Sequence, residues 1–162
     1  MLNHLAIQNY VLIEKLNLDF SDGLSIITGE TGAGKSIIID AIGLLAGNRA
    51  VTGNIRDGAT SAYIEGLFDL QNKPNVIEGL IESGIEIEDD SLIVTREVTP
   101  TRSVVRLNSR AVPLKLLQTM MTGLIDIQGQ SEQLLLIRSA QQMYLLDAYG
   151  NLLKHAATLK ET

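Results

Sequence analysis

The sequence predicts an α/β fold with a mixed sheet that includes an antiparallel portion, and three observations favour it. Strand-like apolar segments come first, a glycine-rich loop and a helix follow, and strands and helices then alternate. The 162 residues are 45% hydrophobic and 20% charged, which is the composition of a globular domain rather than of a disordered chain. The glycine-rich loop stands between a strand-like run and a helix-like run, as in α/β layers.

Three strands and one helix are expected first. The strands are expected over residues 1–9, 11–20 and 24–28. The third is a short, β-branched run typical of a buried strand. Residues 35–46 carry apolar side chains over most of their helical faces, which predicts a helix packed on two sides and ended by Gly47 and Asn48.

The rest of the chain is expected to alternate between the two kinds of element. Strands are expected over residues 62–70, 91–98, 103–108 and 123–128, and helices over residues 75–83 and 113–122. Thr99-Pro100-Thr101 predicts a hairpin between two of these strands. Apolar spacing from residue 139 onward predicts a long helix, so we expect one lobe over residues 1–138 and a helix over residues 139–162.

Composition excludes several functional classes. The chain has no cysteine, which excludes disulfide scaffolds, thiolate zinc sites and cysteine nucleophiles. Its net charge of −6 argues against coating nucleic acid through bulk positive charge. A basic start followed by an unbroken apolar run is missing, as is any apolar run of about 20 residues. The expectation is a cytoplasmic protein with no membrane partner.

Residues 29–36 match the phosphate-loop pattern G-x-x-x-x-G-K-[ST] at every fixed position. Glycines let the backbone curl around phosphate oxygens, and successive N–H groups form an anion cradle at the start of a helix. Lys35 is expected to reach the β- and γ-phosphates, and the Ser36 hydroxyl to coordinate Mg²⁺. The candidate nucleotide-binding residues here are Gly29, Glu30, Thr31, Gly32, Ala33, Gly34, Lys35, Ser36 and Ile37.

The catalytic carboxylate of a complete ATPase is harder to find. Guanine-reading motifs of small GTPases are matched only in part and in reversed order, over residues 72–75 and 126–129. A second acidic element needs four apolar residues before an Asp, whereas Asp126 follows only Leu124 and Ile125. The sequence therefore predicts a phosphate cradle without the carboxylate that completes it.

Four segments stand in order along residues 1–150: GETGAGKSIIIDAIGLLAGNRA, NIRDGATSAYIEGLFDL, TRSVVRLNSRAVPLKLLQTM and LIDIQGQSEQLLL. Together with the opening strands they resemble the N-terminal half of SMC-like, ABC-type ATPase heads. Within that class the set is most similar to the RecN family of bacterial DNA repair proteins. The phosphate loop alone is generic, but the ordered set is specific.

The resemblance implies ATP and Mg²⁺ as cofactors in a nucleoid-associated, DNA-dependent ATPase of double-strand break repair. It implies a head-to-head homodimer on ATP and a C-terminal head lobe that supplies the signature segment and the catalytic glutamate. This chain alone is then expected to bind nucleotide weakly and to hydrolyse it negligibly. Residues 139–162 would be the root of a coiled-coil arm.

The resemblance also assigns single residues. Lys35 and Gln128 would be catalytic, with Ser36 and Gln128 on Mg²⁺, although Gln130 competes with Gln128 for the Q-loop role. Arg56 matches the arginine loop near the nucleotide and the DNA-facing surface. Tyr10 and Val11 fall in a segment that flanks the adenine or ribose. Without the resemblance, the simpler interpretation of Gln128 is a polar residue at the end of a strand. The simpler interpretation of Arg56 is a solvated side chain on a polar loop.

A cluster of basic residues near the predicted hairpin is a candidate DNA contact. It comprises Arg96, Arg102, Arg106, Arg110 and Lys115, with only Glu97 as an acidic residue among them. Guanidinium groups along a hairpin edge suit phosphate contact, whereas a solvated hairpin is the simpler reading. Two other functions stay open. One is a self-contained phosphate-loop kinase or NTPase with Asp126 as its carboxylate, and the other is a non-enzymatic interaction module.

Overall fold

The computed structural model describes residues 1–29, 34–127, 143, 146–147, 149–150 and 152. The chain divides into two compact units, Met1–Asp126 and Ile127–Thr162, and the first carries every helix and strand named below. Most of the helix predicted over residues 139–162 lies outside the described residues.

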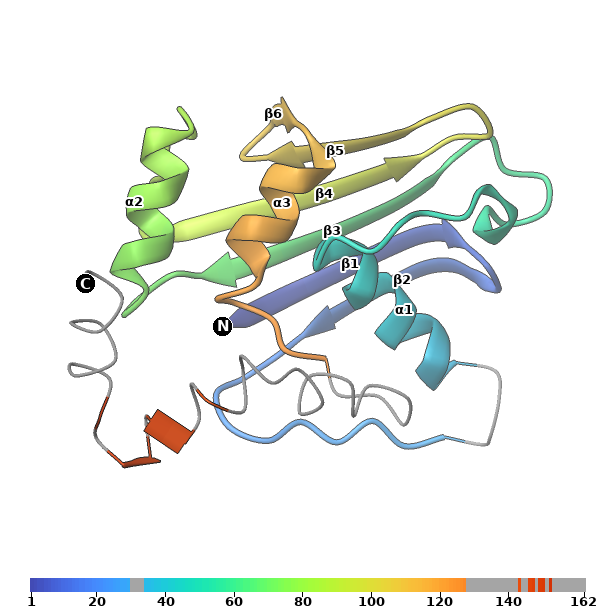
Figure 1. Cartoon of the computed structure of the whole chain (residues 1–162). Coiled ribbons are helices and arrows are strands. Elements are labelled where there is room, and N and C mark those ends of the chain that lie inside the picture. Colours follow the sequence, from blue (N-terminus) through green and yellow to red (C-terminus); the bar gives the residue numbers. More distant parts are fainter. Residues whose placement is uncertain (30–33, 128–142, 144–145, 148, 151, 153–162) are drawn as a thin grey trace. The chain divides into compact units, whose positions relative to one another are not determined.

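A six-stranded sheet forms the first unit (Figure 1). Its strands are β1 (Leu2–Tyr10), β2 (Ile13–Asp19), β3 (Ala62–Asp69), β4 (Ser91–Val98), β5 (Ser103–Leu107) and β6 (Arg110–Val112). The strand order is β2-β1-β3-β4-β5-β6. Every pairing among these strands is antiparallel. The predicted α/β class is confirmed, and the antiparallel portion accounts for all of the sheet that these strands make.

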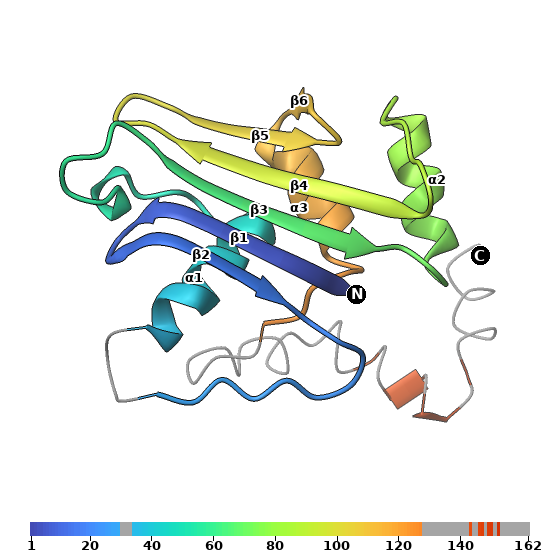
Figure 2. The same cartoon turned by 180° about the vertical axis from the view of Figure 1, so that it is seen from behind.

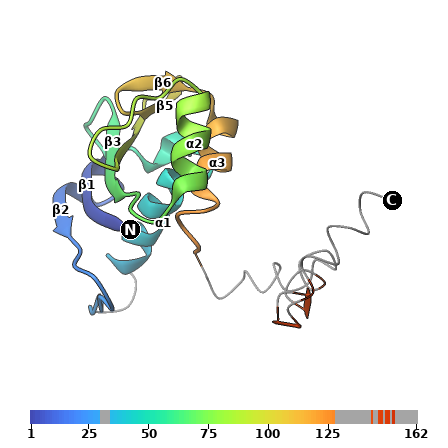
Figure 3. The same cartoon turned by 90° about the vertical axis from the view of Figure 1, so that its left-hand side faces the viewer.

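Three helices lie on the same face of this sheet, as the edge-on view shows (Figure 3). They are α1 (Lys35–Leu45), α2 (Pro74–Glu82) and α3 (Leu114–Met121), and a short 3₁₀ turn spans Thr52–Asn54. No helix covers the opposite face in the view from behind (Figure 2). The first unit is therefore two-layered, with its core between the sheet and the helices.

Period-2 alternation along the strands builds that core. Leu5 and Ile7 of β1, Ile64 of β3 and Val94 of β4 are buried on the covered face. The intervening residues on the open face are mostly polar. There the Tyr63 hydroxyl donates a 2.6 Å hydrogen bond to Glu65, and burial is the main reason why the pKa of Tyr63 is raised.

Two predicted strands do not form. Residues 24–28 are exposed and have no strand partner, and residues 123–127 begin in a turn. Leu24 is 87% exposed and Ile26 is 75% exposed, which contradicts the prediction of a buried strand. An apolar, β-branched run becomes a strand only when a neighbouring strand pairs with it, and the described residues supply none here.

Helix α1 is packed on one side rather than two. Ile37, Ala41 and Leu45 face the sheet, whereas Ile39 is 47% exposed and Asp40 is exposed beside it. The prediction of two covered faces is therefore wrong for the described residues. Its predicted end is confirmed, because Gly47 adopts a positive φ.

The end of α1 is a Schellman motif. Asn48 N–H donates to the Gly43 carbonyl at 2.9 Å, and Gly47 N–H donates to the Leu44 carbonyl at 3.2 Å. Gly47 has φ of +102°, and a Cβ there would lie 2.5 Å from Cγ of Gln118. Glycine is thus required both by conformation and by the close approach of α3.

No helix among the described residues is long and apolar enough to cross a membrane. The same described residues contain no group of three or more His, Asp or Glu side chains that could hold a metal ion.

Candidate functional site

The phosphate-loop motif lies where a long connection from β2 enters α1 (Figure 1). Gly29 and Gly34 flank the loop and are exposed, whereas Glu30, Thr31, Gly32 and Ala33 lie outside the described residues. A Cβ built at Gly29 or at Gly34 would meet no protein atom within 4 Å. Both ends of the loop therefore face open space.

The amino-terminal end of α1 is suited to an anion. Gly34 occupies the N-cap position without a side-chain cap, and the first turn holds no acidic residue. The first intrahelical bond of this turn runs from Ile38 N–H to the Gly34 carbonyl at 3.1 Å. The N–H groups of Lys35, Ser36 and Ile37 precede it, so they are free of helical partners and add to the positive end of the helix dipole.

Lys35 lies at the mouth of the loop. Its Nζ donates a hydrogen bond to the Gly29 carbonyl, which joins the two ends of the motif. Ser36 is exposed at the same helix end, so its hydroxyl is open to a ligand. Ile37 is buried in the core, and of its groups only the backbone N–H is suited to contact a nucleotide.

Three further predicted residues are not part of this arrangement. Gln128 and Gln130, the two candidates for the Q-loop role, lie outside the described residues. Asp126, the carboxylate of the alternative enzyme reading, is exposed and follows a turn rather than a strand. The structure thus brings together Gly29, Gly34, Lys35 and Ser36 at the amino-terminal end of α1.

The segment that carries Arg56 is fastened to the end of β1. Val11 N–H donates to the Asn54 carbonyl at 2.7 Å, and Arg56 N–H donates to the Asn9 carbonyl at 3.0 Å. Tyr10 also bridges to Ile55. These backbone bonds fix the Arg56 segment at one end of the sheet.

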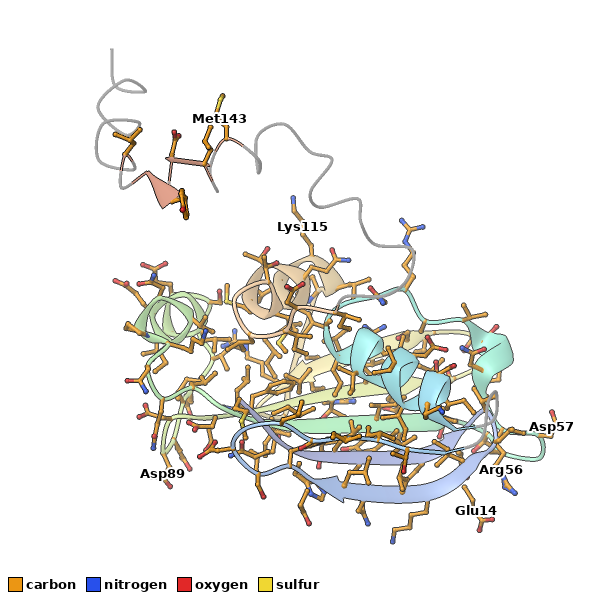
Figure 4. All side chains as sticks on the ribbon, turned by 90° about the horizontal axis from the view of Figure 1, so that it is seen from below. Glu14, Arg56, Asp57, Asp89, Lys115 and Met143 are labelled. Carbon is orange, nitrogen blue, oxygen red and sulfur yellow. The ribbon has the colours of Figure 1, made fainter. Side chains whose placement is uncertain are left out.

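The Arg56 side chain reaches Glu14 on β2. The Nη1–Oε2 distance is 3.5 Å, and both side chains are more than a third exposed, so water screens this ion pair. Figure 4 shows Glu14, Arg56 and Asp57 together, with Lys115 far away on α3. An open pocket of about 440 Å³ lies against this group and is lined by Asn9, Glu14, Arg56, Asp57, Gly58, Ala59 and Thr60. Arg56 is therefore accessible to a ligand.

Tyr10 is buried beneath the Arg56 segment. It is 3% exposed, and its hydroxyl accepts a 3.0 Å hydrogen bond from Asn54 Nδ2. Burial raises the pKa of Tyr10, the Asn54 bond opposes that shift, and the charge of Asp40 on α1 adds to it. The side chain of Tyr10 is thus bonded to the Arg56 segment and is too buried to contact an adenine or a ribose.

Arg96 does not belong to a surface patch. It is 1% exposed on the covered face of β4. Its Nη1 donates to the Leu44 carbonyl at 2.8 Å and to the Asn48 carbonyl at 3.2 Å, and its Nη2 donates to Ser103 Oγ at 3.1 Å. The prediction of DNA contact through Arg96 is therefore wrong in this structure. The alternation along β4 indicates a buried position for Arg96, because Arg96 shares its face of the strand with Val94 and Val98.

The other members of the basic cluster remain at or near the surface: Arg102, Arg106, Arg110 and Lys115. Two of them are engaged within the protein. Arg106 pairs with Glu97 across the open face at 3.1 Å, and Arg110 donates to the Gly84 carbonyl. Arg102 and Lys115 are exposed, on the β4–β5 hairpin and on α3.

Comparison with protein families finds one match over nearly the whole chain. Residues 4–160 match the model of a family described as the AAA domain. Among curated proteins, the DNA repair protein RecN of Bacillus subtilis is 41% identical over 151 residues, which cover 93% of this chain and 26% of that protein. RecN of Synechocystis is 40% identical over 171 residues, which cover all of this chain and 29% of that protein. The chain thus spans about a quarter to three tenths of these relatives.

Solved structures share the fold. A structure reported under ATP-driven dimerization and DNA-stimulated activation of SMC ATPases has a TM-score of 0.65 at 22% identity, over 90% of this chain and 97% of that one. The Smc head domain of Pyrococcus furiosus, with an extended coiled coil and bound to the C-terminal domain of ScpA, has a TM-score of 0.72 at 21% identity. That match covers 99% of this chain and 44% of the other. The predicted class, an SMC-type head fold, is confirmed.

Proposed function

This chain belongs to the AAA-domain family, and on that premise we propose that it is the ATP- and Mg²⁺-binding lobe of a RecN-like DNA repair ATPase. One observation supports the proposal most: the phosphate-loop motif opens onto the uncapped amino-terminal end of α1, with Lys35 at its mouth. The similarity to RecN proteins over at least 93% of the chain supports the biological setting.

The residues in the loop suit the triphosphate of ATP and its metal ion. Backbone N–H groups from Gly29 to Ile37 would surround the phosphate oxygens, and Lys35 would exchange its bond to the Gly29 carbonyl for the β- and γ-phosphates. The Ser36 hydroxyl would hold Mg²⁺, with Gln128 or Gln130 as a second ligand. Bound Mg²⁺ would neutralise phosphate charge, while this chain binds and orients the nucleotide.

Turnover is proposed to need more polypeptide than this chain. The chain covers 26% to 29% of the two RecN proteins. We propose that a C-terminal lobe supplies the catalytic glutamate and that a second head supplies the signature segment in an ATP-bound homodimer. The exposed run around Leu24 and Ile26 supports a further lobe, because that run has strand propensity and no described strand pairs with it.

DNA is proposed as the further partner of the complete protein. Arg56 and Arg102 are the best candidates within the described residues, because both have solvent access and belong to loop or hairpin segments. Phosphate contact by guanidinium groups would be independent of sequence. Such contact would associate the protein with the nucleoid.

Titration calorimetry of MgATP against the 162-residue chain tests the proposal. We expect binding by the wild type, and at least a tenfold loss in K35A, since Lys35 carries the charge at the loop mouth. Lys15 is an exposed lysine on β2, so K15A is the matched control for loss of one positive charge. The proposal is wrong if K35A binds MgATP as tightly as K15A does.

The same preparation distinguishes the alternative enzyme class. A self-contained kinase or NTPase would show phosphate-loop-dependent turnover in this chain, and D126N would abolish it. We expect the wild-type chain to show no more turnover than K35A. We expect turnover to appear only when the C-terminal lobe is added.

A further inference from the structure

Arg96 is a buried cation that pairs with no described anionic group. The residue is 1% exposed, and within the described part of the chain it forms no ion pair. Its Nε has no hydrogen-bond partner there either. Burial of an unpaired charge is costly, so the contacts that Arg96 does make must offset that cost.

Those contacts converge on the carboxyl-terminal end of α1. The Leu44 carbonyl belongs to the last turn of the helix, and the Asn48 carbonyl follows the Schellman motif. This end carries the negative pole of the helix dipole, which favours a cation. Arg96 therefore occupies the position that a basic C-cap residue would take, although it comes from β4 rather than from α1, whose last turn has no basic residue.

The third contact ties the same group to the hairpin. Nη2 donates to Ser103 Oγ at the start of β5, directly across from Val98 of β4. One side chain thus joins the end of α1 to both strands of the β4–β5 hairpin.

Support at one end of a helix affects the other end. The helix has 11 residues and is about 16 Å long, so a tilt of about 5° about its carboxyl end moves its amino end by about 1.4 Å. Lys35 and Ser36 are located at that amino end. A displacement of about 1 Å is large enough to disturb a preorganised site severely.

We propose that Arg96 is a positioning residue for the phosphate loop: it holds the carboxyl end of α1 on the β4–β5 hairpin and so fixes how the amino end presents Lys35 and Ser36 to a nucleotide. This inference rests on the proposed ATP-binding function. It assigns Arg96 no contact with the nucleotide itself.

Three variants separate positioning from general stability. R96M keeps an apolar stem in the core and removes all three hydrogen bonds. R96K keeps a positive charge beside the end of α1. V105A is the matched control, because Val105 lies opposite Arg96 in the sheet and is 5% exposed, yet its side chain makes no polar contact with α1.

MgATP affinity is measured at a temperature at which every variant is folded. We expect about tenfold weaker binding in R96M, with R96K within about threefold and V105A within about twofold of wild type even though V105A melts earlier. The proposal is overturned if R96M binds within about twofold of wild type, or if V105A weakens binding as much as R96M does.

Amide hydrogen exchange gives a readout that does not depend on nucleotide. In R96M the amides of Ala46, Gly47 and Asn48 should exchange faster than in V105A, since these amides bond to carbonyls at the end of α1. Equal exchange in the two variants would overturn the positioning role. If the wild type and K35A both fail to bind MgATP, the proposed function is wrong, and exchange still decides the role of Arg96.

If R96M does not fold, S103A tests the positioning role of Arg96 instead. It removes one acceptor of Arg96 from an exposed position, so the core remains intact. We expect about threefold weaker MgATP binding and faster exchange at Gly47 and Asn48. Wild-type affinity together with wild-type exchange in S103A would overturn the proposal.

Discussion

Gly66, on the covered face of β3, is the residue on which the close approach of α1 to the sheet depends most directly. A Cβ at this position would lie 2.7 Å from Cδ1 of Leu45 and 2.9 Å from Cε2 of Phe68. Both neighbours are buried, so neither has space into which it could withdraw. The spacing between α1 and β3 is thus set by the absence of a side chain.

We therefore predict that G66A lowers the free energy of unfolding by about 1–3 kcal/mol, because it overpacks the core beneath α1. Urea denaturation measures the change. Gly53 is the matched control, since a Cβ there meets no atom within 4 Å and its φ is not in the left-handed region. Equal midpoints for G66A and G53A would contradict the prediction.

Single residues also show what sequence reasoning could and could not reach. The fixed positions of the phosphate loop were identifiable because their chemistry is local: Gly34, Lys35 and Ser36 are neighbours in the chain. The prediction of a surface position for Arg96 rests on its charge alone. It does not consider on which face of the strand the alternation places the side chain. Its partners Leu44 and Asn48 lie about 50 residues away in the sequence, so no local pattern reveals them.

At the scale of elements, the segment that carries Arg56 is held by one partly buried side-chain hydrogen bond in addition to its backbone bonds. Asn54 Nδ2 donates to the Tyr10 hydroxyl at 3.0 Å, and Tyr10 is in turn packed in the core. This bond connects the end of β1 to the segment.

A double-mutant cycle of Y10F and N54A tests that contact. We expect a coupling free energy of about 1 kcal/mol, the usual net contribution of one hydrogen bond, measured from urea unfolding of the two single variants and the double variant. Y63F with N54A is the control pair, because Tyr63 bonds to Glu65 on the open face and should be additive with Asn54. Additivity of Y10F and N54A would show that the bond contributes nothing to stability.

The elements that the sequence predicted correctly are those whose boundaries are marked locally. Pro74 begins α2 and Gly84 follows it with φ of +75°, and the hairpin between β4 and β5 turns at residues 99–102. The prediction of a buried strand over residues 24–28 was wrong. Burial of that segment depends on a partner strand, and no local signal in the sequence shows whether one is present. Strand β6 was missed because it has three residues, too few to show alternation.

On the scale of the whole molecule, residues 24–28 form an exposed apolar run that no described strand pairs with. Leu24 and Ile26 are exposed on an extended segment beyond the edge strand β2. An unpaired, apolar segment of this kind is a template for pairing with other chains. We relate it to the further lobe proposed above.

It follows that the 162-residue chain should self-associate as its concentration rises, and that L24S combined with I26S should shift it toward monomer. Sedimentation velocity over a concentration series measures both effects. Ile81 on α2 is 59% exposed and lies outside this segment, so I81S should leave association unchanged. A monomeric wild type, or equal effects of I81S and the double variant, would contradict the prediction.

The order of strands in the sheet has a consequence for how the protein is made. Strand β1 pairs with β2 at once through a tight turn, but its other neighbour, β3, begins at Ala62 after the loop and α1 have been synthesised. Joining β1 to β3 closes a long chain segment, and such closures are slow relative to local hairpins. The hydrogen bond from Arg96 to the Leu44 carbonyl in the last turn of α1 can also form only after β4 has been synthesised. We therefore expect the phosphate loop to acquire its final geometry only after β3 and β4, which follow it in the chain, have been synthesised.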